Sequence, residues 1–200
     1  DFVKITADAP ALKNNGLSTP VPFDTNGDGF IDTVYAGDLR GNMWKFFVGP
    51  NAGDPTVTNV AGTWKLALSA AGCTDNCTPL FSAKDAVDNP QPIIWPAEVT
   101  LHPAGGTVVL FGTGKYLEAA DNGNNAAQTF YGIYDNGAAV PGRVNLTPQV
   151  ISTAVVAGVT YRNVTKGCGV APLPACQAAP KGWYADLPTL GERTTGVPKL

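Results

Sequence analysis

The sequence predicts an all-β fold built from short antiparallel strands, and three observations favour this class. The chain has 200 residues with 44% hydrophobic and 14% charged content, which is enough for a packed core and excludes a disordered chain. Its glycines (23) and prolines (17) are dense enough to interrupt helices and to suit many turns. Between these turns lie apolar and aromatic runs of strand length, so the pattern indicates strands.

The expected strands form two groups with a common order. The first group covers 19–23, 33–39, 42–48 and 63–69, and the second covers 91–101, 107–114, 128–135 and 159–165. An apolar run ending in Gly-Asp or Gly-Thr, then a turn, then an aromatic strand occurs as VYAGDLRGNMWKF. The same plan recurs, with an insert, as VLFGTGKYLEAADNGNNAAQTFYGIYD. Four antiparallel strands repeated in this way are typical of the blades of a β-propeller.

We therefore expect a portion of a modified β-propeller, with approximate four-stranded blades over 19–69 and 90–187. Residues 1–6 would be an outer strand of a preceding blade, and 194–200 would open a following one. The stretches 70–89 and 135–149 are expected to be inserted loops. Because two blades cannot close a ring, we expect the remainder of the propeller, or a partner, to cover the open edges.

The loop DTNGDGFID joins the first two expected strands and has the spacing of a calcium loop. Alternate positions carry Asp24, Asn26, Asp28 and Asp32, and the backbone carbonyl of Phe30 falls at position seven. Alternating oxygen donors of this kind surround a hard cation, and glycine at position six allows the sharp turn. A plain polar turn is the alternative. It does not require three carboxylates, whose mutual repulsion favours a bound cation.

The loop departs from a complete EF-hand at its end. Position twelve is Tyr35 instead of a bidentate glutamate, and the residues after Asp32 alternate as in a strand instead of a helix. We expect calcium as the cofactor, with weak affinity on the order of 10⁻⁵ to 10⁻³ M, the range of extracellular modules. Magnesium is disfavoured because its small octahedral shell prefers water and phosphate.

Four cysteines form two local pairs in loop-like surroundings. Cys73 and Cys77 enclose three residues, and Cys168 and Cys176 enclose seven. Zinc is the competing interpretation, but its usual spacing within a pair is shorter. We favour two disulfides, which imply an oxidising compartment such as the periplasm or the cell exterior.

Composition and motifs argue against several other functions. A net charge of −3 and a pI near 5.0 give no basic surface for nucleic acid, and no apolar run could span a bilayer. The single histidine, His102, is expected at a strand end or on the surface, and FGTGKY lacks the residues of a phosphate loop. Glu118, Asp121 and Asp135 are either a second acidic site or solvated loop charges. We expect no enzymatic activity.

Tryptophan side chains could form a stacking surface for sugars or fill the core. Aromatic residues on blade strands usually pack between sheets. The tryptophans are therefore expected in the core, and they are Trp44, Trp64, Trp95 and Trp183.

Several motifs together resemble a known family. TPVPFDTNGDGFIDTVYAGDLRGNMWKF, PQPII, VVLFGTGKYLEAAD, QTFYGIYD and KGWYADLPTLGER are similar, in this order, to the C-terminal β-propeller domain of the PilY/PilC family associated with bacterial type IV pili. The resemblance covers nearly the whole chain, and the calcium loop of the family matches the loop described above. The cysteine pairs are not recognised as family features.

The resemblance implies a function at the bacterial cell surface or pilus tip, after export through the periplasm and outer membrane. It implies that the domain supports pilus assembly, opposes retraction, and contributes to adhesion and twitching motility. Its expected partners are pilin or minor pilin subunits, host surface receptors and the remainder of the propeller. An integrin-like calcium-binding propeller is one alternative, although it would need the loop in several blades. A quinoprotein enzyme is another, although no candidate base is present.

Overall fold

The computed structural model describes residues 15–52, 64–70, 73, 77–166 and 181–199. Regular structure in this part of the chain is almost entirely β, with two short 3₁₀ helices at Ala119–Gly123 and Arg143–Asn145. The all-β prediction is therefore confirmed. Within the described residues, no helix has the length and apolar character to cross a membrane.

The first sheet is built around a long central strand. Its strands are β1 (Val21–Phe23), β2 (Ile31–Gly37), β3 (Asn42–Ala52), β4 (Lys65–Leu66) and β5 (Phe81–Ser82). They follow the order β1-β2-β3-β4, and β5 pairs with the beginning of β3. All of these pairs are antiparallel.

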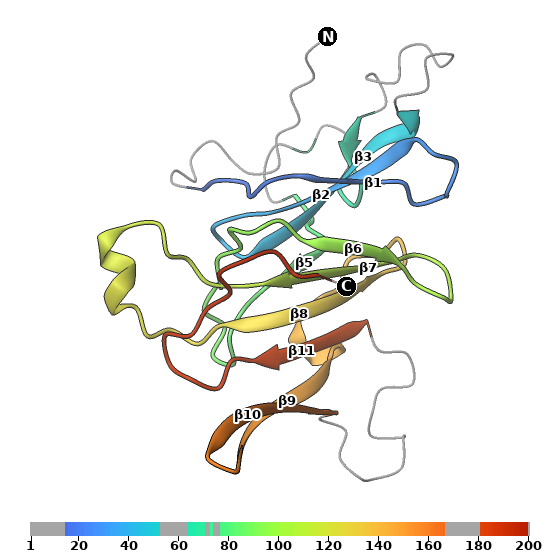
Figure 1. Ribbon diagram of the computed structural model, residues 1–200. Helices are drawn as coiled ribbons and strands as arrows, with labels where there is room; N and C mark the ends of the chain where they lie inside the picture. The colour runs from blue at the N-terminus through green and yellow to red at the C-terminus, as the bar shows by residue number, and fades with distance from the viewer. Residues whose placement is uncertain (1–14, 53–63, 71–72, 74–76, 167–180, 200) are drawn as a thin grey trace.

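The second sheet is longer and has one parallel pair. Its strands are β6 (Glu98–Leu101), β7 (Thr107–Gly112), β8 (Thr129–Asp135), β9 (Thr147–Val156), β10 (Val159–Lys166) and β11 (Gly182–Asp186). The order is β10-β9-β11-β8-β7-β6, with β9 and β11 parallel. Figure 1 shows the first sheet above the second, and the β9–β10 hairpin at the end of the second sheet farthest from the first.

One hydrophobic core joins the two sheets, because side chains alternate between the faces of each strand. From the first sheet, Tyr35 and Met43 point into this core. From the second sheet, Phe111, Tyr131 and Ile133 meet them, and each of these side chains is at most 1% exposed. The opposite face of the first sheet has its own smaller cluster, formed by Ala36, Trp44, Phe46, Leu66 and Cys77.

Three strands differ from the sequence prediction. The expected loop 70–89 contains β5, and the expected loop 135–149 already includes the start of β9. The expected fourth strand of the second group, 159–165, corresponds to β10, but β11 is the strand that pairs with β8. Sequence order misled the prediction, because β9 and β10 form a local hairpin that stands outside β11.

The structure also tests the expected strands at the two ends of the chain and the expected burial of the tryptophans. Residues 1–6 lie outside the described residues, and 194–199 contain no strand. Trp44 is buried as expected, whereas Trp64 and Trp95 are 38% and 36% exposed, so their assignment to the core was wrong. Trp64 directly precedes the edge strand β4, and Trp95 lies in a proline-flanked segment before β6, where less of the structure covers them. The blade boundaries proposed above stay a prediction.

Candidate metal centre

The candidate calcium loop closes the β1–β2 hairpin. Phe23 pairs with Thr33 and Val21 with Tyr35, so the two strands bring the ends of the loop together. The chain leaves the loop directly into β2, as the alternating residues after Asp32 predict. The loop is therefore anchored to the sheet that faces the common core.

Asp24 organises the first half of the loop. Its Oδ1 accepts the backbone N–H groups of Gly27 at 2.7 Å and Asn26 at 3.2 Å, and its Oδ2 accepts that of Gly29 at 2.7 Å. Gly27 and Gly29 have φ values of 78° and 91°, which non-glycine residues rarely adopt. The N–H of Gly29 is the largest influence on the pKa of Asp24 and lowers it. Desolvation comes next and opposes this effect, and the N–H groups of Gly27 and Asn26 add to it, so the pKa lies below its ordinary value.

The same arrangement continues along the loop. Asn26 Oδ1 accepts the backbone N–H of Asp28 at 2.9 Å, and Asp28 Oδ1 accepts that of Phe30 at 2.9 Å. Asn26 Nδ2 also donates to Asp28 Oδ2 at 3.0 Å. Alternate side chains thus turn back onto the loop backbone and fix its shape.

Asp32 is in a different environment from the other carboxylates of the loop. It is only 4% exposed, whereas Asp28 lies in the exposed part of the loop. Thr25 Oγ1 lies 2.7 Å from both carboxylate oxygens of Asp32, and the Thr25 N–H donates to Oδ2 at 3.1 Å. Among the described residues, no lysine or arginine forms an ion pair with Asp32. A buried carboxylate with only neutral donors is costly, and a divalent cation would offset that cost.

The predicted ligands differ in their hydrogen-bond partners. Asp24, Asn26 and Asp28 are joined by hydrogen bonds within the loop, while Asp32 is held by Thr25. Within the described residues, no three histidine, cysteine, aspartate or glutamate side chains are placed to hold a metal ion. Calcium binding would require Asp32 to exchange a Thr25 hydrogen bond for the ion, so the ligand set stays a prediction.

The chemistry of the donors nevertheless fits calcium. Three carboxylates, one amide oxygen and one backbone carbonyl are hard oxygen donors, and the loop offers neither nitrogen nor sulfur ligands of the kind that zinc or copper prefers. Asp24, Asn26, Asp28, Asp32 and the carbonyl of Phe30 would hold the ion. A bound calcium ion would supply positive charge that joins the loop to the start of β2.

A buried polar cluster lies at the junction of the two sheets, and sequence reasoning missed it. The Tyr35 hydroxyl donates to Asp135 Oδ2 at 2.6 Å and shares a hydrogen bond of 2.9 Å with Thr107. Lys45 Nζ lies 2.7 Å from the same Oδ2 atom. Burial, together with the charge of Asp135, raises the pKa of Tyr35 far above its usual range. We call Tyr35, Lys45, Thr107 and Asp135 the junction cluster.

The other acidic candidates do not form one site. Glu118 and Asp121 both pair with Lys115, and the separation from Lys115 Nζ to Asp121 is 3.0 Å. The backbone N–H of Leu117 is the main cause that lowers the pKa of Asp121. Asp135 belongs to the junction cluster instead. Glu118 and Asp121 thus stabilise the loop in which they lie through their ion pairs with Lys115.

His102 lies directly after the end of β6, as the sequence predicts. Its ring centroid is 4.3 Å from that of Tyr134, and its Nδ1 accepts the N–H of Ala104 at 3.1 Å. These contacts are those of a residue that shapes a turn.

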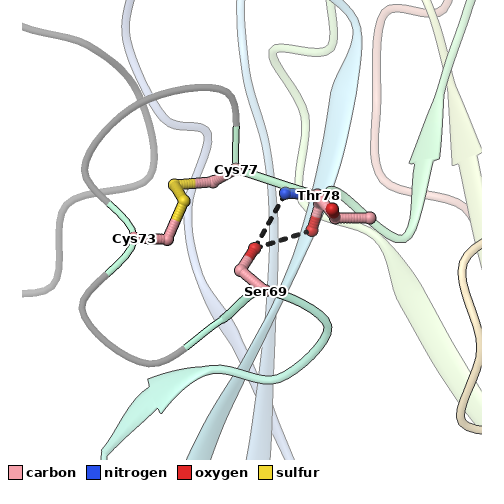
Figure 2. Close-up of a disulfide and its surroundings, with 4 residues drawn as sticks. All are labelled: Ser69, Cys73, Cys77 and Thr78. Carbon is pink, nitrogen blue, oxygen red and sulfur yellow. Dashed lines mark hydrogen bonds between the residues drawn. A yellow bond between two sulfur atoms is a disulfide. The ribbon is translucent and has the colours of Figure 1, made fainter.

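A disulfide joins Cys73 and Cys77, whose Cα atoms are 5.8 Å apart. Figure 2 shows it beside two hydrogen bonds between Ser69 and Thr78, which hold together the two sides of this loop. Cys77 is 8% exposed and packs in the cluster on the outer face of the first sheet. Cys168 and Cys176 lie outside the described residues, so their pairing stays a prediction.

Comparison with known proteins identifies close relatives of the chain. Residues 4–157 match a family model described as the PilY1 beta-propeller domain. A type IV pilus biogenesis factor PilY1 homolog of Xylella fastidiosa is 34% identical over 192 residues, which are 95% of this chain and 12% of that protein. Type IV pilus biogenesis factor PilY1 of Pseudomonas aeruginosa strain UCBPP-PA14 is 36% identical over 182 residues, 86% of this chain and 16% of that protein.

A solved structure gives the same result. The crystal structure of the Pseudomonas aeruginosa PilY1 C-terminal domain superposes with a TM-score of 0.67 at 33% identity, covering 90% of this chain and 41% of that one. The chain therefore spans less than half of the solved domain and about one sixth or less of the two curated relatives.

Proposed function

Because this chain belongs to the PilY1 β-propeller domain family, we propose that it is a calcium-binding part of a type IV pilus biogenesis protein. Its role is structural and not enzymatic. It acts at the bacterial surface or pilus tip, where it supports pilus assembly, opposes retraction, and contributes to adhesion and twitching motility. Pilin or minor pilin subunits, host surface receptors and the rest of the propeller are its partners.

The observation that carries the calcium assignment is the environment of Asp32. This carboxylate is 4% exposed and, among the described residues, receives hydrogen bonds from Thr25 alone. It lies at the end of a loop whose other oxygen donors alternate as calcium ligands do. Calcium would neutralise it and join the loop to β2. An ion at a hundred times its dissociation constant would stabilise the folded state by roughly 2.7 kcal/mol.

The test is a calcium titration of the protein and of two variants. We expect calorimetry to detect one weak site and calcium to raise the melting temperature. Asp32→Ala removes a ligand and should abolish both effects. Asp85→Ala is the control, because Asp85 is likewise a carboxylate that accepts backbone N–H groups, those of Val87 and Asn89, but it lies outside the calcium loop.

Two results would contradict the proposal. If Asp32→Ala binds calcium as the parent protein does, the ligand assignment is wrong. If calcium binds but changes neither the melting temperature nor the number of surface pili in bacteria that make the protein, calcium has no part in pilus function.

A further inference from the structure

Tyr35 occupies the loop position at which an EF-hand has its last calcium ligand. Its side chain is 0% exposed, and its hydroxyl is committed to Asp135 and Thr107 in the second sheet. Turning it toward the loop would leave Asp135 without one of its donors in a buried site. Tyr35 therefore cannot complete a calcium shell.

The loop therefore supplies five predicted ligands and has no glutamate at its twelfth position. Calcium takes six to eight oxygen ligands. The five residues of the loop reach six only if one carboxylate binds through both oxygens, which leaves room for water or for an external oxygen atom.

A hollow of about 510 Å³ opens beside the loop. We call it the loop hollow, and its polar lining includes Thr25, Asn26, Asp32, Thr33, Lys45 and Lys65. Two of these residues, Asn26 and Asp32, are predicted calcium ligands. An ion held by them would therefore border the hollow.

The two lysines of the loop hollow differ in whether a described carboxylate pairs with them. Lys45 is 2.7 Å from Asp135 and belongs to the junction cluster. Lys65 Nζ lies 5.8 Å from the ring centroid of Phe47 and forms no ion pair among the described residues. Lys65 is exposed, and no described carboxylate neutralises its charge.

We propose that the loop hollow binds an acidic side chain of a partner protein, whose carboxylate ligates the calcium ion and pairs with Lys65. The proposal rests on the calcium function above. A carboxylate is the ligand that satisfies both neighbours, because calcium prefers hard anionic oxygen and an ammonium group donates hydrogen bonds to it. Because Tyr35 stands in place of the last ligand of an EF-hand, the calcium shell would be incomplete on the side that faces the loop hollow.

Terbium luminescence tests the proposal directly. Tb³⁺ replaces calcium in oxygen sites, and its lifetimes in H₂O and D₂O report how many water molecules it binds. We expect at least two bound waters in the protein. The probe is the peptide acetyl-Gly-Asp-Gly-amide, which should displace one or more of them, and acetyl-Gly-Asn-Gly-amide is the control that should not.

A variant of Lys65 tests the proposed ion pair with the partner carboxylate. Lys65→Ala should weaken binding of the aspartate peptide by up to about fivefold, the factor expected for one exposed ion pair, without weakening Tb³⁺ binding. Lys84→Ala, which removes an exposed lysine remote from the loop hollow, should leave peptide binding unchanged.

The outcomes separate this inference from the calcium function. If the parent protein binds neither Tb³⁺ nor calcium, the calcium function itself is wrong. If Tb³⁺ binds without coordinated water, or the two peptides act alike, or Lys65→Ala binds the aspartate peptide as the parent does, the carboxylate proposal is wrong while calcium binding stands.

Discussion

Asp135 carries an unusual share of the contact between the two sheets. Its Oδ2 accepts from Tyr35 and lies 2.7 Å from Lys45, and its Oδ1 accepts the backbone N–H of Gly137 at 2.9 Å. The side chain is 1% exposed, so loss of a donor would leave a buried carboxylate oxygen poorly satisfied. Each of the three donors is therefore needed to keep the carboxylate buried.

Removing one of these donors should be costly. We expect Tyr35→Phe to lower the free energy of unfolding by about 1–3 kcal/mol, because it leaves the buried carboxylate of Asp135 under-satisfied. Urea denaturation measures this change. Tyr134→Phe is the control, since that hydroxyl bonds the exposed carbonyl of Gly105 and its loss should cost less than about 0.5 kcal/mol. Equal effects of the two variants would show that the junction cluster contributes nothing special.

Tyr131 should make the stability of the protein depend on pH. Burial raises its pKa to about 12, and its hydroxyl bonds Gln91 and the carbonyl of Lys84, each at 2.8 Å. The unfolded chain releases this proton near pH 10, so the tyrosine stabilises the fold below pH 10 and that stability is lost as the pH rises toward 12. Tyr131→Phe should reduce the slope of stability against pH in this interval by about 1.4 kcal/mol per pH unit. Urea denaturation between pH 9 and 11.5 measures it, and an unchanged slope would refute the assignment.

Sequence reasoning performs unevenly at this scale. The calcium loop is visible because its residues are consecutive and their spacing has a chemical meaning. The contact of Tyr35 with Asp135 joins residues 100 positions apart, and each of them alone reads as an ordinary strand residue. From the sequence, Tyr35 is only a residue at which the loop lacks a ligand, and its contact with Asp135 is visible only in the three-dimensional structure.

Among the strands, β8 and β11 depend on a glycine. Gly132 lies opposite Trp183 in the register of the two strands, and a Cβ atom at Gly132 would lie 2.5 Å from the indole ring. The indole also contacts Phe130, with ring centroids 5.8 Å apart. The absence of a side chain at Gly132 thus leaves room for the indole of Trp183.

A methyl group at this glycine should disturb the pair. We expect Gly132→Ala to destabilise the protein by roughly 1–3 kcal/mol, because the indole must move from its position. Gly123→Ala is the control, since no atom lies within 4 Å of its added Cβ. Thermal unfolding followed by tryptophan fluorescence compares the two, and a smaller loss for Gly132→Ala than for Gly123→Ala would contradict the packing argument.

The pattern of strands was predictable where residues alternate within long runs. Most of β2, β3, β7 and β8 was expected from the sequence, because each combines apolar or aromatic residues with a clear turn at its end. The strand β5 has two residues, which is too short for an alternating pattern of apolar and polar residues. It is recognised as a strand because it pairs with the start of β3. The position of β11 depends on long-range pairing, which the periodicity of a segment does not contain.

At the scale of the whole molecule, the two sheets share a core, but the β9–β10 hairpin stands apart from it. Eight residue pairs join its two strands, while three parallel pairs join β9 to β11. Exposed apolar residues cover the hairpin, and they are Val150, Val155, Val156, Val159, Tyr161 and Val164. An ion pair between Arg162 and Glu192 links it to the C-terminal segment.

This arrangement predicts a gradient of stability. A two-stranded hairpin is only marginally stable on its own, so backbone amides near its turn at Ala157 should exchange with solvent much faster than those of β7 and β8. Hydrogen exchange followed by NMR measures both sets in one experiment. Equal protection at the turn and at buried Val109 or Ile133 would mean that the hairpin unfolds only with the whole protein.

The overall class followed from composition and turn density, and the family from its combination of motifs. The sizes of the two sheets did not follow, because they depend on which segments meet, as the insertion of β11 between β8 and β9 illustrates. Repetition in the sequence suggested equal groups of four strands, whereas the described residues form sheets of five and six.

The hydrogen bonds that Asp24, Asn26 and Asp28 accept from backbone N–H groups of the loop also have a kinetic consequence. Because the first half of the loop already holds its curvature, ion binding would require a local change at Asp32 and Thr25 and not folding of the whole loop. With the weak affinity expected for this loop, a bound ion would also leave readily, so the occupancy of the loop would follow the surrounding calcium concentration.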